Sequence, residues 1–222
     1  MLNGKIKIVL GLVLVVLLGL LVIFFMFGVS DASKFKREYE AYNGVSLGEG
    51  TYLKLDISKD NGIKYLNDDN IVEELSHGSK IIYFGFPDCN WCRMAVPVLL
   101  DAASLNGIKD IYYYNFKNVR NDYYLGKDNN GSRVYEGIIK ILDKYISVTF
   151  EDGKNKGKKR ITAPMVVLVN NGKISSVHLG TISSHKDYEK DLTKDERDEL
   201  FTMYEDMMVE LLLCDDECKD YE

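Results

Sequence analysis

Hydrophobic and polar positions change their spacing several times after residue 50, and each spacing predicts an element of secondary structure. Alternating or continuous apolar runs predict strands over residues 51–57, 62–66, 80–86 and 110–116, and a hairpin over 164–180 that turns at Asn171-Gly172. Apolar residues at helical spacing predict helices over 67–75, 90–105, 134–146 and 193–214. The stretches 119–133 and 151–160 are polar and contain glycine, and they predict loops. Strands that alternate with helices in this order predict an α/β fold with a mixed central sheet flanked by helices.

Three of the expected helices have residues at one end that typically begin or terminate a helix. Asn67 or Asp68 is suited to cap the first, and Asn106-Gly107 is a C-terminal stop for the second. Thr193 with a glutamate three residues later forms a capping box for the last. Because caps satisfy the backbone groups that are left free at helix ends, these residues set the expected boundaries.

The first thirty residues differ in pattern from the rest of the chain. After Lys5 and Lys7 no charged residue occurs before Asp31, and residues 8–27 are apolar throughout. Twenty residues in a helix span about 30 Å, the thickness of the hydrocarbon core of a bilayer. We therefore expect residues 1–30 to be a single-pass transmembrane signal anchor, with the two lysines in the cytoplasm and the rest of the chain outside. A cleaved signal peptide is the alternative, since residues 28–30 are small enough for a peptidase.

The chain after the anchor divides by composition. Residues 31–61 are charged at first and rich in glycine later, which predicts a stalk with a short helix. Residues 62–213 are expected to form one globular domain, and residues 214–222 a C-terminal tail. The net charge of −6 argues against nucleic-acid binding, which requires a clustered basic surface.

The candidate chemistry lies at Cys89 and Cys92. All four cysteines follow the apolar stretch, so the expected topology places them where disulfides persist. Cys89 stands between a strand and a helix, and the free N–H groups and the dipole of the helix favour its thiolate. That thiolate would attack a disulfide, and Cys92, one turn later, would resolve the mixed disulfide. Asp88 disfavours the thiolate, and Arg93 is expected to offset that effect.

Other pairings of the cysteines are open. A redox pair is favoured over a structural Cys89–Cys92 disulfide and over a zinc site completed by Cys214 and Cys218, because the first pair does not lie in a zinc knuckle. Cys214 and Cys218 are four residues apart on a helix, where Cβ atoms are about 5–6 Å apart. A local disulfide is favoured there, over a second redox pair, free thiols or metal ligands.

The region around the cysteines resembles the thioredoxin-like superfamily. The motif Cys89-Asn90-Trp91-Cys92 follows a strand and opens a helix, Pro97 lies inside that helix, and Pro164 precedes an apolar run in "ITAPMVVLVNNGK". The sequence "FGFPDCNWCR", the anchor and the late cysteine pair are similar to membrane-anchored thioredoxin-like proteins of Gram-positive bacteria, including the bacteriocin transport accessory type. Two departures are the Asn-Trp dipeptide between the cysteines and Tyr83, which stands where thioredoxin has a buried aspartate.

The resemblance implies a thioredoxin-like fold with an insertion, over about 118–161, before a strand that begins at a cis-proline. Ala163, Pro164 and Trp91 would then bind an extended substrate, although Trp91 could instead simply cover Cys92. No metal or cofactor is expected, and His77, His178 and His185 predict surface positions.

The expected function is an extracytoplasmic thiol-disulfide oxidoreductase acting on thiols and disulfides of exported proteins or peptides, with a membrane redox partner as a candidate. The alternative is a peptide-binding or transport-accessory module in which the cysteines do not turn over.

Overall fold

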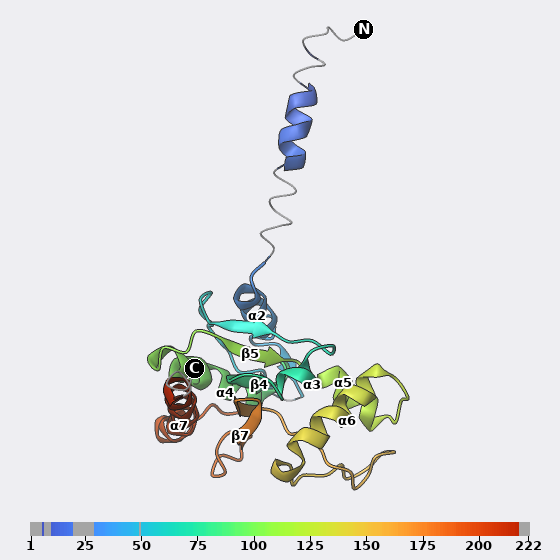
Figure 1. Cartoon of the computed structure of the whole chain (residues 1–222), viewed down its shortest axis with the longest axis vertical. Helices are drawn as coiled ribbons and strands as arrows, with labels where there is room; N and C mark the ends of the chain where they lie inside the picture. Colours follow the sequence, from blue (N-terminus) through green and yellow to red (C-terminus); the bar gives the residue numbers. More distant parts are fainter. Residues whose placement is uncertain (1–5, 7–9, 20–28, 49, 218–222) are drawn as a thin grey trace.

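The computed structural model describes residues 6, 10–19, 29–48 and 50–217, with side chains up to residue 213. The elements in chain order are α2 (Asp31–Glu40), β1 (Ser46–Leu47), β2 (Gly50–Thr51), β3 (Ile63–Tyr65), α3 (Ile71–Glu74), β4 (Lys80–Phe84), α4 (Asn90–Leu105), β5 (Ile111–Tyr114), α5 (Lys117–Tyr124), α6 (Asn130–Leu142), η1 (Asp143–Tyr145), β6 (Met165–Asn170), β7 (Lys173–Leu179) and α7 (Lys194–Glu217). Their arrangement is shown in Figure 1.

Five of the strands form a mixed sheet in the order β3-β5-β4-β6-β7. The strands β3, β5 and β4 are parallel, and the hairpin β6-β7 adds to β4 in the antiparallel direction. The central strand β4 is buried on both faces from Ile81 to Phe84, which explains its continuous apolar sequence. The expected α/β fold with a mixed, helix-flanked sheet is therefore confirmed.

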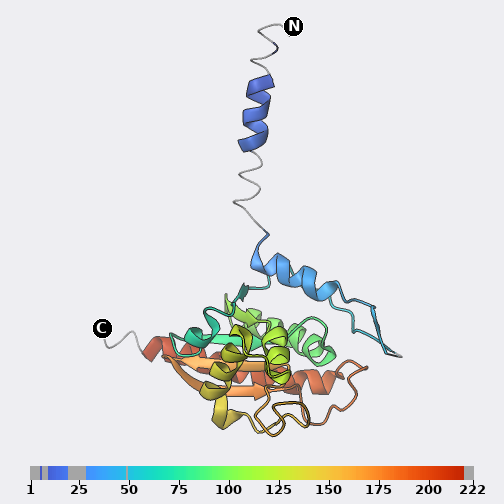
Figure 2. The ribbon, with the colours of Figure 1, turned by 90° about the vertical axis from the view of Figure 1, so that its right-hand side faces the viewer.

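Helices cover both faces of this sheet, as Figure 2 shows from the side. Alternate residues of β4 point to opposite faces, so Ile81 and Tyr83 join a core with α2, α4 and α7, whereas Ile82 and Phe84 join a core with α3, α5 and α6. The end of β4 thus lies between two closed apolar layers, and the cysteine motif begins directly after it.

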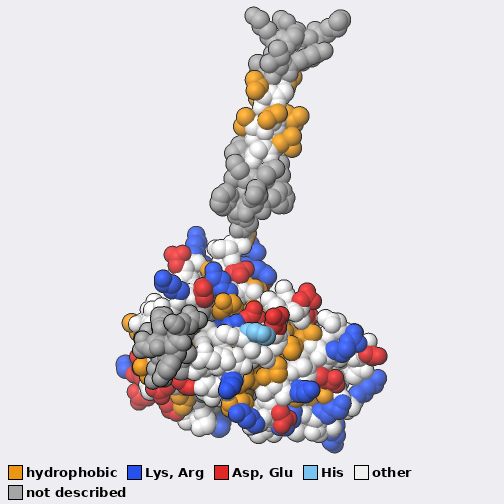
Figure 3. Space-filling view, in the orientation of Figure 1, with side chains coloured by type: hydrophobic (Ala, Val, Ile, Leu, Met, Phe, Trp, Pro, Cys, Tyr) orange, Lys and Arg blue, Asp and Glu red, His pale blue; other side chains and the backbone are white. Residues whose placement is uncertain are grey.

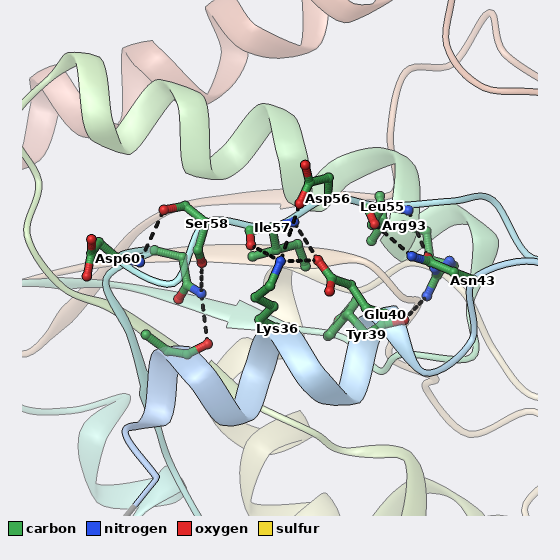
Figure 4. Close-up of polar contacts among 12 residues, drawn as sticks. Lys36, Tyr39, Glu40, Asn43, Leu55, Asp56, Ile57, Ser58, Asp60 and Arg93 are labelled. Carbon is green, nitrogen blue, oxygen red and sulfur yellow. Dashed lines mark hydrogen bonds and ion pairs between the residues drawn. The ribbon is translucent and has the colours of Figure 1, made fainter.

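The segment 31–61, which we expected to be a stalk, is packed on the domain instead. Phe35 and Tyr39 of α2 are fully buried in the same core as the sheet. Lys36 Nζ donates to the carbonyl oxygen of Ile57 at 2.6 Å, and Glu40 Oε1 accepts from the N–H of Ile57 at 2.8 Å (Figure 4). Two aromatic residues four positions apart, Phe35 and Tyr39, hold α2 in place. The charged residues around them made this apolar face hard to detect in the sequence.

The alternating stretch 51–57 belongs to a ladder only at its start, where β2 pairs with β1. Its later apolar residues do point inward, since Leu55 and Ile57 are buried. Side chains take the place of a partner strand: Asn90 accepts from the N–H of Leu53, and Asn43 both donates to and accepts from the backbone of Leu55. Alternation predicted the burial correctly but not the partner.

The polar stretch 119–133, expected to be a loop, is helical at both ends, and only residues 125–129 form a loop. It contains most of α5 and the first turn of α6. Val119 and Tyr123 of α5 are buried four residues apart, whereas Asn121 between them is exposed. Two apolar residues in a short polar segment suffice to fix a helix once a neighbouring core exists.

Several local signals are confirmed. Helix α4 ends at Asn106-Gly107 with Gly107 at φ 69°, and the hairpin turns through Asn171 and Gly172, both with positive φ. Thr193 and Glu196 form the expected capping box. The cap of α3 differs, because Asn70 is the N-cap and Asn67 instead accepts hydrogen bonds within the preceding turn.

Half of the expected anchor over residues 8–27, namely 8–9 and 20–27, lies outside the described residues. Residues 10–19 are helical, and their large apolar side chains are exposed, as the orange atoms of the N-terminal segment in Figure 3 show. Within the part of the chain that the structure describes, no helix is both long enough and apolar enough to span a membrane.

Candidate functional site

Cys89 is the N-cap residue of α4, directly after the loop that leaves β4. Its backbone is extended, with φ −133° and ψ 111°, and its Sγ accepts a hydrogen bond from the N–H of Cys92 at 3.2 Å. Cys92 lies one turn later and is fully buried, whereas Cys89 is partly exposed, and both are free cysteines. A sulfur thus occupies the place of a helix-capping oxygen, where the free N–H groups stabilise negative charge.

The two thiols differ in acidity. Hydrogen bonds from the thiol and the N–H of Cys92 lower the pKa of Cys89, against the opposing effect of burial, and nearby Arg120 lowers it further. Burial raises the pKa of Cys92 well above its ordinary value, and the neighbouring Cys89 adds to that rise. The partly exposed sulfur is therefore the more acidic and the more reactive of the two, and the buried thiol stays protonated.

The charges around Cys89 differ from those expected. Asp88 forms an ion pair with Lys117, which reduces its effect on the thiolate. Arg93, expected to offset Asp88, is fully buried and donates to carbonyl oxygens. The cation that acts on Cys89 is Arg120 of α5, which sequence spacing could not identify because it reaches the site only through the packing of α5 beside β5 and β4.

A cis peptide bond between Ala163 and Pro164 faces the cysteines. Antiparallel pairing of Phe84 with Met165 brings the start of β6 beside the end of β4. The thiol of Cys89 consequently lies 3.9 Å from the carbonyl oxygen of Ala163. The fold brings these segments, 74 residues apart in the chain, to one end of the sheet.

Cys89 lines a cleft of about 770 Å³ that is open to solvent. Its other walls include Trp91, Ala163, His185, Arg120 and Arg160. Of the residues singled out from the sequence, the cleft brings together Cys89, Trp91 and Ala163, while Cys92 lies beneath it in the core.

Trp91 packs edge-on against His185, with the ring centroids 5.7 Å apart. Both ring nitrogens of His185 face acceptors and donate to them: Nδ1 to Glu196 Oε2 at 3.1 Å, and Nε2 to the carbonyl oxygen of Asp187 at 2.8 Å. Burial lowers the pKa of His185, but the hydrogen bonds, that to Glu196 foremost, more than offset it, so the pKa is raised. This imidazole, held by its hydrogen bonds, packs against Trp91, which lines the cleft and also packs against the core that contains Cys92.

The surface positions predicted for the three histidines are only partly confirmed. His77 is exposed as expected, but the side chain of His185 is only 8% exposed and pairs with a carboxylate eleven residues away. His178 is partly buried, hydrogen-bonds the carbonyl oxygen of Thr181 and packs edge-on against Tyr204. The partner of His185 is Glu196, which belongs to the capping box at the start of α7. The spacing of residues in the sequence did not reveal this pairing.

Beneath Cys92 the buried neighbours are phenols rather than a carboxylate. The hydroxyl groups of Tyr83 and Tyr39 are 2.9 Å apart, and Tyr113 stacks on Tyr83. Burial raises the pKa of all three well above the ordinary range, so they are neutral. No aspartate or glutamate is buried among the described residues.

The second cysteine pair lies outside the described side chains, because Cys218 and the side chain of Cys214 are not among them. Across the described residues, no three histidine, cysteine or acidic side chains gather in a manner that could hold a metal ion.

Comparison with known proteins adds no relative. No model of a known protein family matches the chain. No curated protein matches it significantly either.

Proposed function

We propose that the protein is a thioredoxin-like thiol-disulfide oxidoreductase, tethered to the membrane and acting outside the cytoplasm on exported proteins or peptides. The observation that carries this proposal is the asymmetry of the two thiols: Cys89 has a lowered pKa and lines a cleft, and Cys92 is buried one turn away with a raised pKa. A structural disulfide or an inert thiol pair requires no such difference.

The thiols would act in two steps. The Cys89 thiolate attacks one sulfur of a substrate disulfide, so that a Cys89–substrate bond forms and the substrate S–S bond breaks. The departing substrate thiolate takes the proton of Cys92, and the Cys92 thiolate then attacks Cys89. This second exchange forms the Cys89–Cys92 disulfide, releases the other substrate thiol and completes the transfer of two electrons. The reverse sequence oxidises a substrate dithiol.

The cleft supports a polypeptide substrate. Trp91 offers an apolar ring at the rim, and the backbone at the cis bond between Ala163 and Pro164 lies beside the sulfur of Cys89. An extended peptide placed here could pair with that backbone while one of its sulfurs meets Cys89. The mixed sheet and this cis-proline beside a C-x-x-C helix are the features that support membership of the thioredoxin-like superfamily.

The membrane tether rests on the sequence. Residues 8–27 have the length and apolar composition of a single span, and Lys5 and Lys7 favour a cytoplasmic N-terminus. Protease protection of the full chain in sealed vesicles would test this orientation, since a domain facing outward is digested without permeabilisation.

The activity is tested with the full chain and three variants. Cys89→Ser should abolish reduction of insulin and oxidation of a reduced peptide, and Cys92→Ser should accumulate mixed disulfides with substrate. The double variant Cys214→Ser, Cys218→Ser is the matched control and should retain activity. Full activity of Cys89→Ser, or none in the parent, would contradict the proposal and favour a binding module.

The direction of electron flow follows from the equilibrium potential of the pair against glutathione. A value near about −270 mV would make the protein a reductant of its substrates, and one near about −120 mV would make it a disulfide donor.

A further inference from the structure

Two arginines, Arg120 of α5 and Arg160 of the segment before β6, lie next to each other in the wall of the cleft that contains Cys89. We propose that this arginine pair binds a carboxylate of the substrate, so that the protein prefers disulfides whose cysteine is flanked by an acidic residue. The inference rests on the proposed function, because it names the substrates of the same cleft.

Aromatic rings hold both guanidinium groups in position. The Cζ atom of Arg120 lies 4.8 Å from the ring centroid of Phe86 and 5.5 Å from that of Phe116, and Cζ of Arg160 lies 5.9 Å from that of Phe150. Such stacking fixes the plane of a guanidinium and leaves its N–H groups free to donate. The geometry is that of a prepared site rather than of two mobile surface chains.

No carboxylate of the described part of the chain neutralises the positive charge of the arginine pair. Among the described residues, no aspartate or glutamate lies within ion-pair distance of Arg120 or Arg160. Asp88, the acid that lines the same cleft, is paired with Lys117. Glu151 and Asp152 line an adjoining hollow with both arginines, but neither forms an ion pair with them, and Asp152 accepts a hydrogen bond from the hydroxyl of Tyr124 at 2.9 Å.

Two adjacent cations that are partly withdrawn from water require a counter-charge. Burial lowers the pKa of Arg120, and the neighbouring Arg160 lowers it further. A carboxylate accepts two parallel hydrogen bonds from a guanidinium, which makes it the best match among the groups that a peptide carries. Since Arg120 also acts on Cys89, the acidic residue would lie close to the reacting cysteine in the substrate.

The preference is measurable with three peptides that differ only at the residue beside a single cysteine, which is Glu, Gln or Lys. Each cysteine is joined to thiopyridine as a pyridyl disulfide. Attack by Cys89 of the reduced full chain on the peptide sulfur breaks this bond and releases thiopyridone, whose absorbance gives the rate. We expect the Glu peptide to react about tenfold faster than the Gln peptide, and the Lys peptide to be the slowest.

Variants connect that preference to the arginine pair. In Arg120→Gln and Arg160→Gln the ratio of the Glu to the Gln rate should fall to near one, and this ratio cancels any change in the acidity of Cys89. Arg160→Lys keeps the charge and should retain part of the preference. The matched control is Arg133→Gln, because Arg133 is exposed, pairs with Asp128 and does not line the cleft. It should keep the tenfold ratio.

Other outcomes separate this inference from the proposed function. Equal rates for all peptides in the parent, or an unchanged ratio in both arginine variants, would overturn the carboxylate site while the oxidoreductase stands. No release of thiopyridone above that of Cys89→Ser would overturn the proposed function itself. Faster reaction with oxidised glutathione than with its neutral ester would indicate that the recognised carboxylate belongs to a small disulfide substrate. A preference confined to peptides would indicate that it belongs to a polypeptide substrate. Both support the site.

Discussion

Replacing Arg93 by methionine should remove a large part of the stability of the domain. The side chain is fully buried and donates four hydrogen bonds: to the carbonyl oxygens of Leu53, Tyr39 and Pro87 at 2.6, 2.6 and 3.1 Å, and to Oδ1 of Asn43 at 2.6 Å. Figure 4 shows this side chain reaching from α4 toward α2 and the strand-like segment beside it. The guanidinium therefore joins three segments: the end of α2 with the turn after it, the segment 51–57, and the loop before Cys89.

The expected loss of stability follows from these four hydrogen bonds. Methionine fills a similar volume but donates nothing, so four hydrogen bonds are lost; Oδ1 of Asn43 and the carbonyl oxygen of Tyr39 keep their bonds from backbone N–H groups. A net contribution of about 1 kcal/mol per hydrogen bond gives a loss of about 4 kcal/mol in the free energy of unfolding. That is a large share of the roughly 5–15 kcal/mol that stabilises a typical domain. Because Pro87 lies in the loop before Cys89, alkylation of Cys89 should also change.

Urea unfolding of the full chain, followed by the fluorescence of Trp91 and by circular dichroism, measures this loss. Trp91 is the single tryptophan of the sequence, so its signal comes from the site itself. Arg133→Met is the control: its side chain is 64% exposed and makes one surface ion pair, which predicts a change of about 0.5 kcal/mol or less. A loss below about 1 kcal/mol for Arg93→Met would refute the reasoning that these hydrogen bonds hold the segments together.

Three further predictions concern the thiol, α2 and His185. When the rate of alkylation of Cys89 is plotted against pH, the midpoint should lie below about 8.5, and Arg120→Gln should raise that midpoint. An unchanged midpoint would show that Arg120 does not influence the acidity of Cys89. Phe35→Ala should cost about 3–5 kcal/mol in urea unfolding because Phe35 is fully buried, whereas a free stalk would lose nothing. The pKa of His185 is raised in the folded protein, so its stabilising interaction with Glu196 is fully present below about pH 6.5 and is lost as pH rises through the raised pKa. His185→Gln should therefore destabilise the domain more at about pH 5.5 than at about pH 9, and an equal or reversed difference in unfolding free energy would contradict the ion pair.

Local signals in the sequence predicted the elements that carry the site. The start of α4 at Asn90, its end at Asn106-Gly107 and the turn at Asn171-Gly172 depend on residues within a few positions of one another, and the structure has them where expected. The same holds for the apolar strand β4, because a continuous β-branched and aromatic run has few alternatives.

Segments that depend on distant partners were predicted less well. The stretch 119–133 contains only a few apolar residues, and its helix α5 forms because Val119 and Tyr123 meet a core built by other elements. The charged helix α2 is held by Phe35 and Tyr39 in the opposite core, and its neighbour 51–57 is held by side chains in place of a strand. Tertiary packing overrode the local polarity in each case.

The sequence by itself determined the identity and spacing of Cys89 and Cys92, their place between a strand and a helix, and therefore which sulfur is near the helix dipole. The tertiary structure decided what surrounds them: Arg120 beside the thiol, Lys117 on Asp88, and His185 against Trp91. The reason is physical. A cap acts over one helical turn and is written in adjacent residues, whereas electrostatic and packing partners act through space, and only the order of strands in the sheet brings them to the same cleft.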